Sequence, residues 1–174
     1  MNDIRSFAPI ANEVAAILIL GSMPSQVSLS KKEYYGHKKN AFWPIILNIF
    51  NKELDYNKAS YRQRENILLT HKIALWDVLQ SCHRPGSLDA AITMSSIKSN
   101  DFLSFFSQHK KIQTVFFNGA KAESIYMKTV SSQVKSQFSY LSYVRLPSTS
   151  PAYAAMPFRE KLDIWRHAIA TDPV

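Results

Sequence analysis

Two kinds of hydrophobic pattern alternate along the chain. Residues 14–20 are an uninterrupted apolar run closed by Gly21, which is typical of a strand buried on both faces of a sheet. Similar runs cover residues 73–79, 114–117 and 143–146. We therefore predict four strands, each ending close to a turn.

Between these runs, apolar residues recur at helical spacing. Helices are predicted from about Asn40 to Phe50, from Ser60 to roughly His71, over residues 99–108, over residues 120–130, and from Pro157 onward. Ser60 and Gln63 have the spacing of a capping box, and Pro157 suits a first helical position. The apolar face of the last helix is predicted to pack in the core through Phe158, Leu162, Trp165 and Ile169.

Strands that alternate with helices predict an α/β fold with a parallel sheet covered on both sides. Such sheets bind ligands at the carboxyl ends of their strands. Gly21, Gly86, Gly119 and Pro147 each follow a predicted strand, so we expect a basic cleft there, with Tyr35 and Ser148 on the same side. A dinucleotide site is disfavoured, because no G-x-G-x-x-G follows the first strand, and no P-loop signature is present.

Composition narrows the class of protein. The 174 residues predict a single domain over residues 1–174, with 46 % hydrophobic residues to form its core. A net charge of +8 favours an acidic partner such as nucleic acid or an anionic membrane, although solubility alone also explains it. The single cysteine, Cys82, excludes an internal disulfide and a cysteine-rich zinc site. We expect an intracellular, cytoplasmic monomer that does not bind membranes, because no signal peptide or long apolar segment is apparent.

The segment 34–43, Y-Y-G-H-K-K-N-A-F-W, carries the clearest candidate chemistry. Aromatic faces, cations and a neutral amide are what a protein needs to hold an extruded nucleobase. Tyr35 lies beside Gly36 in a polar loop, which favours stacking on a ligand, whereas Phe42 and Trp43 are expected in the core. Each polar member has a simpler explanation. His37, Lys38 and Lys39 fit a solvated loop, and Asn40 fits a helix N-cap.

Asp77 is a carboxylate inside an otherwise apolar strand, so it needs a partner. Two explanations remain equally open. Asp77 forms a structural pair with Arg84 or caps loop amides, or it accepts a hydrogen bond from a base in a pocket. The hydroxyls of Ser148, Thr149 and Ser150 lie between two prolines and fit either a chain turn or contacts with phosphate oxygens.

These motifs together resemble the uracil-DNA glycosylase superfamily, and most closely its family 6 hypoxanthine (deoxyinosine) DNA glycosylases. The resemblance rests on the loop 20–24, the segment 34–43, the strand 74–79 with Cys82, Arg84 and residues 86–89, the strand end 117–119, and the loop 146–152. It implies a three-layer α/β/α sandwich on a four-stranded parallel sheet. The implied activity is excision of hypoxanthine in base excision repair, without a metal or other cofactor. Excision of uracil or xanthine is an alternative, and a non-catalytic nucleic-acid-binding module is a second one.

The resemblance also implies roles for individual residues. Tyr35 matches the aromatic that stacks on the flipped base, Asp77 falls where relatives keep a base-reading asparagine, and Asn40 takes the catalytic role. The base would also contact Ser22 and Met23. DNA contacts are expected from Ser25, His37, Lys38, Lys39, Arg84, Ser87, Ser148, Thr149 and Ser150. The loop 146–152 would enter the minor groove.

Two departures from the superfamily argue against an ordinary uracil enzyme. Met23 stands where most members have an Asp or Asn that positions the attacking water, and Leu146 stands where uracil enzymes keep a catalytic histidine. Tyr153 occupies a position where an asparagine is expected. A Schiff-base mechanism at Lys38 or Lys39 is disfavoured, because nothing in the sequence indicates a desolvated amine.

Overall fold

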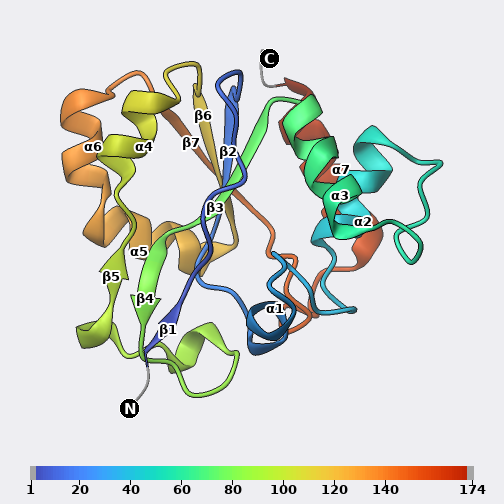
Figure 1. Cartoon of the computed structure of the whole chain (residues 1–174), viewed down its shortest axis with the longest axis horizontal. Coiled ribbons are helices and arrows are strands. Elements are labelled where there is room, and N and C mark those ends of the chain that lie inside the picture. The colour runs from blue at the N-terminus through green and yellow to red at the C-terminus, as the bar shows by residue number, and fades with distance from the viewer. Residues whose placement is uncertain (1–2, 172–174) are drawn as a thin grey trace.

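A four-stranded parallel sheet forms the centre of the computed structural model, which describes residues 3–171 (Figure 1). Its strands are β2 (Ile17–Gly21), β3 (Ile73–Asp77), β6 (Thr114–Asn118) and β7 (Ser142–Leu146), in the spatial order β3-β2-β6-β7. Gly21 lies beside Asp77 in this register, and Asn118 lies beside Leu146. The register therefore brings the residues that follow all four strands to one edge of the sheet, as the sequence predicted.

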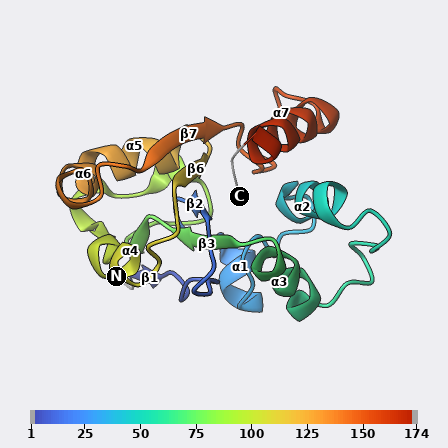
Figure 2. The same ribbon diagram turned by 90° about the horizontal axis from the view of Figure 1, so that it is seen from above.

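Helices cover both faces of this sheet and make three layers (Figure 2). One layer contains α4 (Phe102–Gln108), α5 (Ala120–Thr129) and α6 (Ser131–Gln137). The other contains α2 (Phe42–Phe50), α3 (Tyr61–Thr70) and α7 (Phe158–Thr171), and the short α1 (Gln26–Lys31) lies at the carboxyl end of the strands. The three-layer α/β/α fold is thus confirmed. Strands β2 and β3 are buried on both faces because both layers pack on them.

The predicted strand 73–79 is two strands. β3 ends at Asp77, and β4 (Leu79–Cys82) then joins β1 (Ile4–Arg5) and β5 (Lys98–Ser99) in a small antiparallel sheet. The Asn100 side chain donates to the Asp77 carbonyl at 2.8 Å, and the Asn100 amide donates to the Val78 carbonyl at 3.0 Å. These long-range contacts fix the break, which an apolar pattern cannot show.

The starts of two helices follow local chemistry, whereas one prediction for a third helix is wrong. Ser60 Oγ accepts from the Gln63 amide, and Gln63 Oε1 accepts from the Ser60 amide, so the capping box is present. The predicted helix 99–108 begins only at Phe102, because the Asp101 side chain caps it. Phe158 is 44 % exposed, so its predicted core position is wrong, whereas Leu162, Trp165 and Ile169 are buried as expected.

The layer that carries α2 and α7 is packed by aromatic side chains. Phe42, Trp43 and Trp165 are fully buried, and the Phe42 ring meets the Trp165 ring edge to face at 6.0 Å. The Trp43 indole donates to the Tyr34 carbonyl at 2.7 Å. The expected core placement of Phe42 and Trp43 is confirmed. Their packing anchors the segment 34–43 against the end of the sheet.

Candidate functional site

A pocket of about 360 Å³ opens at the carboxyl ends of the parallel strands. That volume lies within the usual range for small-ligand sites. Its lining comes from six parts of the chain, namely Gly21–Ser25 with Ser28, Tyr34–Tyr35 with Asn40, Asp77, Ser87–Ala90, Asn118, and Ser148–Ser150 with Ala152 and Tyr153. Tyr35 and Ser148 line the same pocket, as expected from the sequence.

Tyr35 reaches the pocket through a strained backbone. Its φ of 54° lies in the left-handed region, and its ring stacks on Phe42 with the centroids 4.1 Å apart. One ring face is therefore covered, and stacking of a base on Tyr35 stays a prediction for the other face. The hydroxyl is buried and has no hydrogen-bond partner within residues 3–171. Burial, with the nearby Asp77, raises the pKa of Tyr35, so this hydroxyl stays protonated and can donate.

Gly21 leaves room for the polar groups at the bottom of the pocket. A Cβ at this position would lie 2.5 Å from Asp77 Oδ1 and 2.9 Å from Tyr35 Oη. Both contacts are shorter than a carbon can tolerate, so any larger residue would displace one of these side chains. The glycine is needed here for close approach, and it brings a hydroxyl and a carboxylate together.

Asp77 is the buried carboxylate of the pocket. It is 3 % exposed, and its Oδ2 accepts a 2.7 Å hydrogen bond from the Ser6 hydroxyl. Desolvation raises the pKa of Asp77 to about 7, with a further contribution from the negative charge of Asp89. The other carboxylate oxygen, Oδ1, faces the space above Gly21.

Arg84 does not form the salt bridge to Asp77 that one explanation required. Its side chain is fully buried and donates to the carbonyls of Met23, Pro24 and Gly86. Its closest carboxylate is that of Asp89, at 3.7 Å. This burial also does not fit the predicted phosphate contact, because the guanidinium is engaged inside the protein and its bonds to Met23 and Pro24 hold the loop after β2 in place.

Ser22 and Asp89 form a polar pair that motif analysis missed. The Ser22 hydroxyl donates to Asp89 Oδ2 at 2.7 Å, although the two residues are 67 positions apart. Burial raises the pKa of Asp89, while the Ser22 bond, Arg84 and Lys121 oppose this shift. The sequence signal was present, since Asp89 closes the segment 86–89 noted above, but nothing local indicated that it meets the loop after β2. Met23 is buried and lines the same pocket beside this pair.

Asn40 lies at the start of α2 and at the pocket. Its Oδ1 accepts from the Phe42 amide at 2.9 Å, so it holds the first residue of α2 from one position before the N-cap, Ala41. It also lines the pocket, and its side-chain nitrogen has no hydrogen-bond partner in the described part of the chain. A free amide donor is thus held in place by the cap. Its catalytic role stays a prediction.

The loop after β7 is held in place by hydrogen bonds to the end of β6 and to the segment 34–43. Thr149 is 1 % exposed, and both its amide and its hydroxyl bond the Asn118 side chain. The Thr149 carbonyl accepts from the Ala41 amide at 3.0 Å, which ties this loop to the segment 34–43. Thr149 is therefore buried and fixed by these bonds, whereas Ser148 and Ser150 remain partly exposed at the pocket. Thr149 anchors the loop, and a phosphate contact from its hydroxyl stays a prediction.

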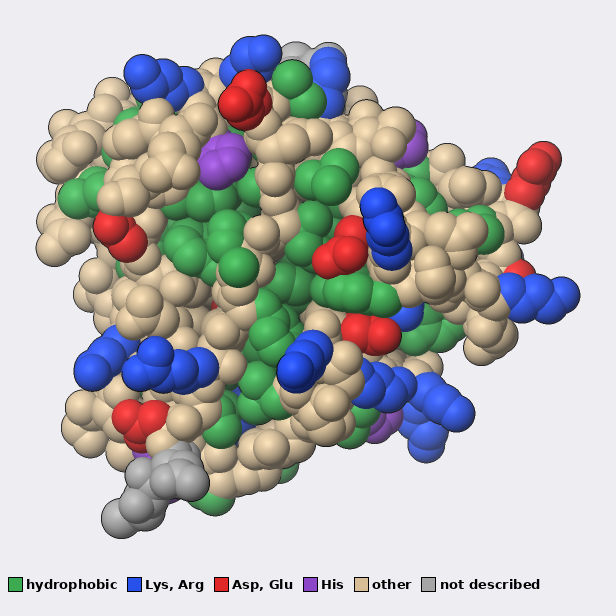
Figure 3. Space-filling model, in the orientation of Figure 1, with side chains coloured by type: hydrophobic (Ala, Val, Ile, Leu, Met, Phe, Trp, Pro, Cys, Tyr) green, Lys and Arg blue, Asp and Glu red, His purple; other side chains and the backbone are tan. Residues whose placement is uncertain are grey.

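Basic residues lie beside the pocket, not in it. The pocket lining contains Asp77 and Asp89 but no Lys or Arg, so the expected basic cleft is wrong for the pocket itself. An adjoining hollow contains Lys38 and Lys39, both exposed, and shares Asn40 with the pocket. Lys and Arg side chains also gather on the lower right of the surface near α1 (Figure 3). Positive charge therefore flanks an acidic pocket.

The remaining predicted contacts lie at the rim. Ser25 caps α1 by accepting from the Ser28 amide, and Ser87 Oγ accepts from the Gln26 amide at 3.0 Å. His37 Nδ1 accepts from the Lys39 amide at 3.1 Å, which shapes the basic turn. Within residues 3–171 there is no cluster of three or more metal-ligating side chains, and no described helix is long and apolar enough to cross a membrane.

Comparisons with known proteins agree with this architecture. Two proteins named hypoxanthine DNA glycosylase, from Methanosarcina barkeri and Methanosarcina acetivorans, are each 36 % identical over 118 residues, covering 68 % of this chain and 72 % of theirs. A solution NMR structure from Methanosarcina acetivorans, provisionally named a uracil DNA glycosylase, superposes with a TM-score of 0.74 at 30 % identity, covering 95 % of this chain and 98 % of that one. The profile of the uracil DNA glycosylase superfamily matches residues 9–169. The chain therefore belongs to the uracil DNA glycosylase superfamily.

Proposed function

We propose that this protein is a monofunctional DNA glycosylase that flips a deaminated base, hypoxanthine, out of DNA and hydrolyses its N-glycosidic bond. Family membership and the names of the two curated relatives support glycosylase activity. The choice of hypoxanthine rests on one further observation, the buried carboxylate of Asp77 at the bottom of the pocket.

The chemistry of Asp77 suits the edge of a deaminated purine. Hypoxanthine presents an N1–H donor beside its O6 acceptor, whereas adenine presents an acceptor and an amino group. Above its raised pKa of about 7 this carboxylate is ionised and only accepts hydrogen bonds, so it then pairs with N1–H and leaves adenine N1 without a donor. The Tyr35 hydroxyl, which lies beside Asp77 over Gly21, is a donor without a partner in the described residues. This donor and acceptor complement the O6 and N1–H pair.

Catalysis in this proposal combines charge stabilisation and positioning. As the bond between C1′ and the base breaks, negative charge develops on the base and positive charge on the sugar. Asn40 supplies an amide donor, fixed by its cap to Phe42, that stabilises the departing base or orients the water. Backbone amides near Ser22 would also hold O6 in this proposal. Lys38 and Lys39 are exposed, which favours hydrolysis over a Schiff-base mechanism.

DNA would lie across the rim of the pocket. Lys38 and Lys39 would neutralise phosphates, and the loop 146–152 would press into the minor groove while Ser148 and Ser150 contact the flanking backbone. We propose that the protein acts as a cytoplasmic monomer, associated with the nucleoid if the cell is bacterial.

A glycosylase panel tests the proposal. Purified protein is incubated with duplexes that differ only in one base, inosine, uracil or xanthine, and abasic sites are cleaved by heating in alkali. Strand breaks in the inosine duplex that require this alkali treatment are expected. Preferential cleavage of the uracil or the xanthine duplex would identify that base, in place of hypoxanthine, as the substrate. Binding without cleavage of any duplex would favour a non-catalytic module.

A further inference from the structure

The pocket contains a second carboxylate, Asp89, that the proposed function does not use. It begins the short 3₁₀ helix η1 (Asp89–Ala91), in the loop between β4 and β5. Its side chain is 39 % exposed, whereas Asp77 is almost completely buried. Both line the same pocket, so one carboxylate lies deep and the other is accessible from solvent.

The position of Asp89 compensates for a missing group. Hydrolysis needs a side chain that holds and activates water, and the loop after β2 offers only Met23 at the expected place. A thioether is a weak acceptor and cannot take a proton from water. Asp89 bonds Ser22, the direct neighbour of Met23, at 2.7 Å. A carboxylate therefore reaches the same corner of the pocket from a different loop.

The two carboxylates lie at different depths in the pocket, which suits them to different tasks. A flipped base enters the pocket first, and its sugar stays nearer the mouth. A group that reads the base must lie deep, as Asp77 does. A group that acts on C1′ and on water must lie nearer the mouth and reach solvent, as Asp89 does.

The surrounding residues hold Asp89 in one orientation. Ser22 Oγ donates a hydrogen bond to Asp89 Oδ2, and the buried guanidinium of Arg84 lies 3.7 Å from Asp89 Oδ1. Arg84 is itself fixed by three loop carbonyls. A preorganised carboxylate costs less reorganisation in the transition state than a mobile one. Lys121 is a further cation that stabilises the charged form of Asp89.

We infer that Asp89 is the catalytic residue that binds and deprotonates the attacking water. The inference rests on the proposed glycosylase function. The water oxygen forms a bond to C1′ while the bond from C1′ to the base nitrogen breaks, and that electron pair leaves with the base. The water proton passes to the Asp89 carboxylate, and the departing base anion takes a proton from solvent. Because sugar and water are common to all substrates, this role does not depend on which base is excised.

Asp89→Asn tests the role directly. The amide keeps the size of the side chain and an oxygen that can accept from Ser22, but it cannot take a proton. Under single-turnover conditions with excess enzyme, the variant should excise the base at least about a hundredfold more slowly than the wild type, the usual scale for removal of a general base. Its melting temperature and its affinity for the same duplex should be unchanged. A structural clamp between Ser22 and Arg84 predicts instead a near-normal rate, which would overturn the inference.

Controls keep the outcome decisive. Asp163→Asn removes an exposed aspartate that pairs with Arg166 on α7, outside the pocket, and should leave the rate unchanged. If Asp89→Asn does not fold, Asp89→Glu and Asp89→Gln are compared, because they differ from each other only in charge. Glu should retain much more activity than Gln, and equal rates would contradict the inference.

Wild type is run in parallel on inosine, uracil and xanthine. Failure to excise hypoxanthine contradicts the substrate proposal alone, and the variants are then measured on the base that is excised.

Discussion

The side chain of Asn118 holds Thr149 through two hydrogen bonds. Its Nδ2 donates to Thr149 Oγ1 at 2.8 Å, and its Oδ1 accepts from the Thr149 amide at 2.9 Å. The pair joins the end of β6 to the loop after β7 and closes one wall of the pocket. Thr149 therefore shapes the pocket by positioning the loop after β7.

Thr149→Val should destabilise the protein and slow excision. Valine keeps the shape of the side chain and the backbone amide but removes Oγ1, which leaves Asn118 Nδ2 without its acceptor. A buried donor left unpaired costs about 1–3 kcal/mol. Urea unfolding measures this cost, and single-turnover kinetics measures the effect on the loop. Thr93→Val is the control, because Thr93 is exposed and its hydroxyl makes no hydrogen bond within residues 3–171. Equal decreases of stability in both variants would contradict the role of the pair.

Asp77 should make stability depend on pH in a defined direction. Its pKa is raised to about 7 in the folded protein, from 3.8 ordinarily. Below about pH 4 it is protonated in both states, so it adds no pH dependence to the free energy of unfolding. Between about pH 4 and 7 the unfolded chain loses this proton while the folded protein keeps it, so the free energy of unfolding falls as pH rises and then levels off.

Asp77→Asn should remove this fall. Asparagine keeps an acceptor for the Ser6 hydroxyl and has no proton to lose. Urea unfolding of both proteins at about pH 5 and about pH 8 gives the comparison, in which all other titrating groups cancel. The wild type should lose more stability than the variant over this interval, and identical decreases would show that Asp77 titrates normally. The variant should also excise hypoxanthine poorly while still binding DNA.

Asn40 allows its two roles to be separated by two substitutions. Asn40→Ala removes the bond to the Phe42 amide and should cost about 1 kcal/mol of stability. The same change should slow single-turnover excision by about a hundredfold or more, the scale for removal of a stabilising donor, while DNA binding persists. Asn40→Asp keeps the cap and exchanges the amide donor for a carboxylate oxygen. It should therefore be stable yet equally slow, and near-normal excision by either folded variant would remove Asn40 from catalysis.

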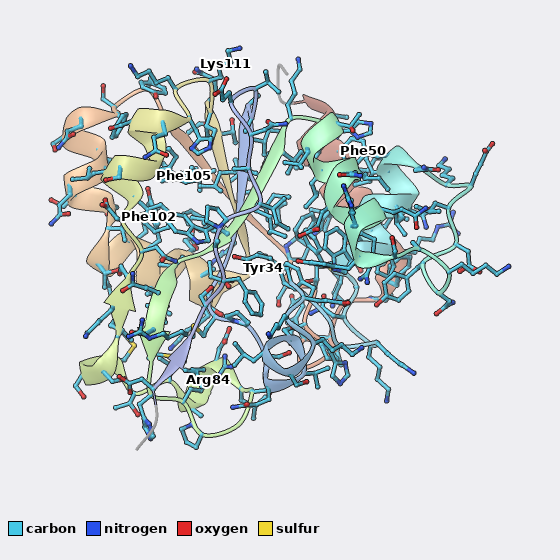
Figure 4. All side chains as sticks on the ribbon, viewed as in Figure 1. Tyr34, Phe50, Arg84, Phe102, Phe105 and Lys111 are labelled. Atoms are coloured by element: carbon cyan, nitrogen blue, oxygen red, sulfur yellow. The ribbon has the colours of Figure 1, made fainter. Side chains whose placement is uncertain are left out.

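Lys38 and Lys39 should act through binding to phosphates. Replacing both with alanine should weaken binding to all duplexes, with or without inosine, and lower the slope of log affinity against log salt by roughly one unit for each phosphate that is no longer neutralised. Lys110 and Lys111 offer a matched pair, since both are exposed and lie before β6, at the opposite end of the sheet from the pocket (Figure 4). The double alanine variant at 110 and 111 should keep the wild-type slope. An equal slope in all three proteins would indicate that Lys38 and Lys39 form a solvated loop and do not contact phosphates.

Local patterns in the sequence predicted most of the fold. Burial of β2, the helical spacing after Asn40 and the capping box at Ser60 each depend on residues close in the chain, and all appear in the structure. Alternation of strands and helices then predicted the parallel sheet and a pocket at the carboxyl ends of its strands. The motif 34–43 indicated Tyr35 and Asn40 as pocket residues, and both line the pocket.

Only the tertiary structure decided the partners within the pocket. The sequence allowed Asp77 to pair with Arg84, yet Arg84 lies against Asp89 and the carbonyls of the loop after β2, while Asp77 accepts from Ser6. It also gave no sign that Asn118 holds Thr149 through two hydrogen bonds. The bonds of Ser6 to Asp77, of Arg84 to Met23 and of Asn118 to Thr149 join residues 31 to 71 positions apart. Local composition and spacing indicate which segments form strands and helices. Which two polar groups meet depends on how strand ends and loops are brought together, and that is settled by packing of the whole chain.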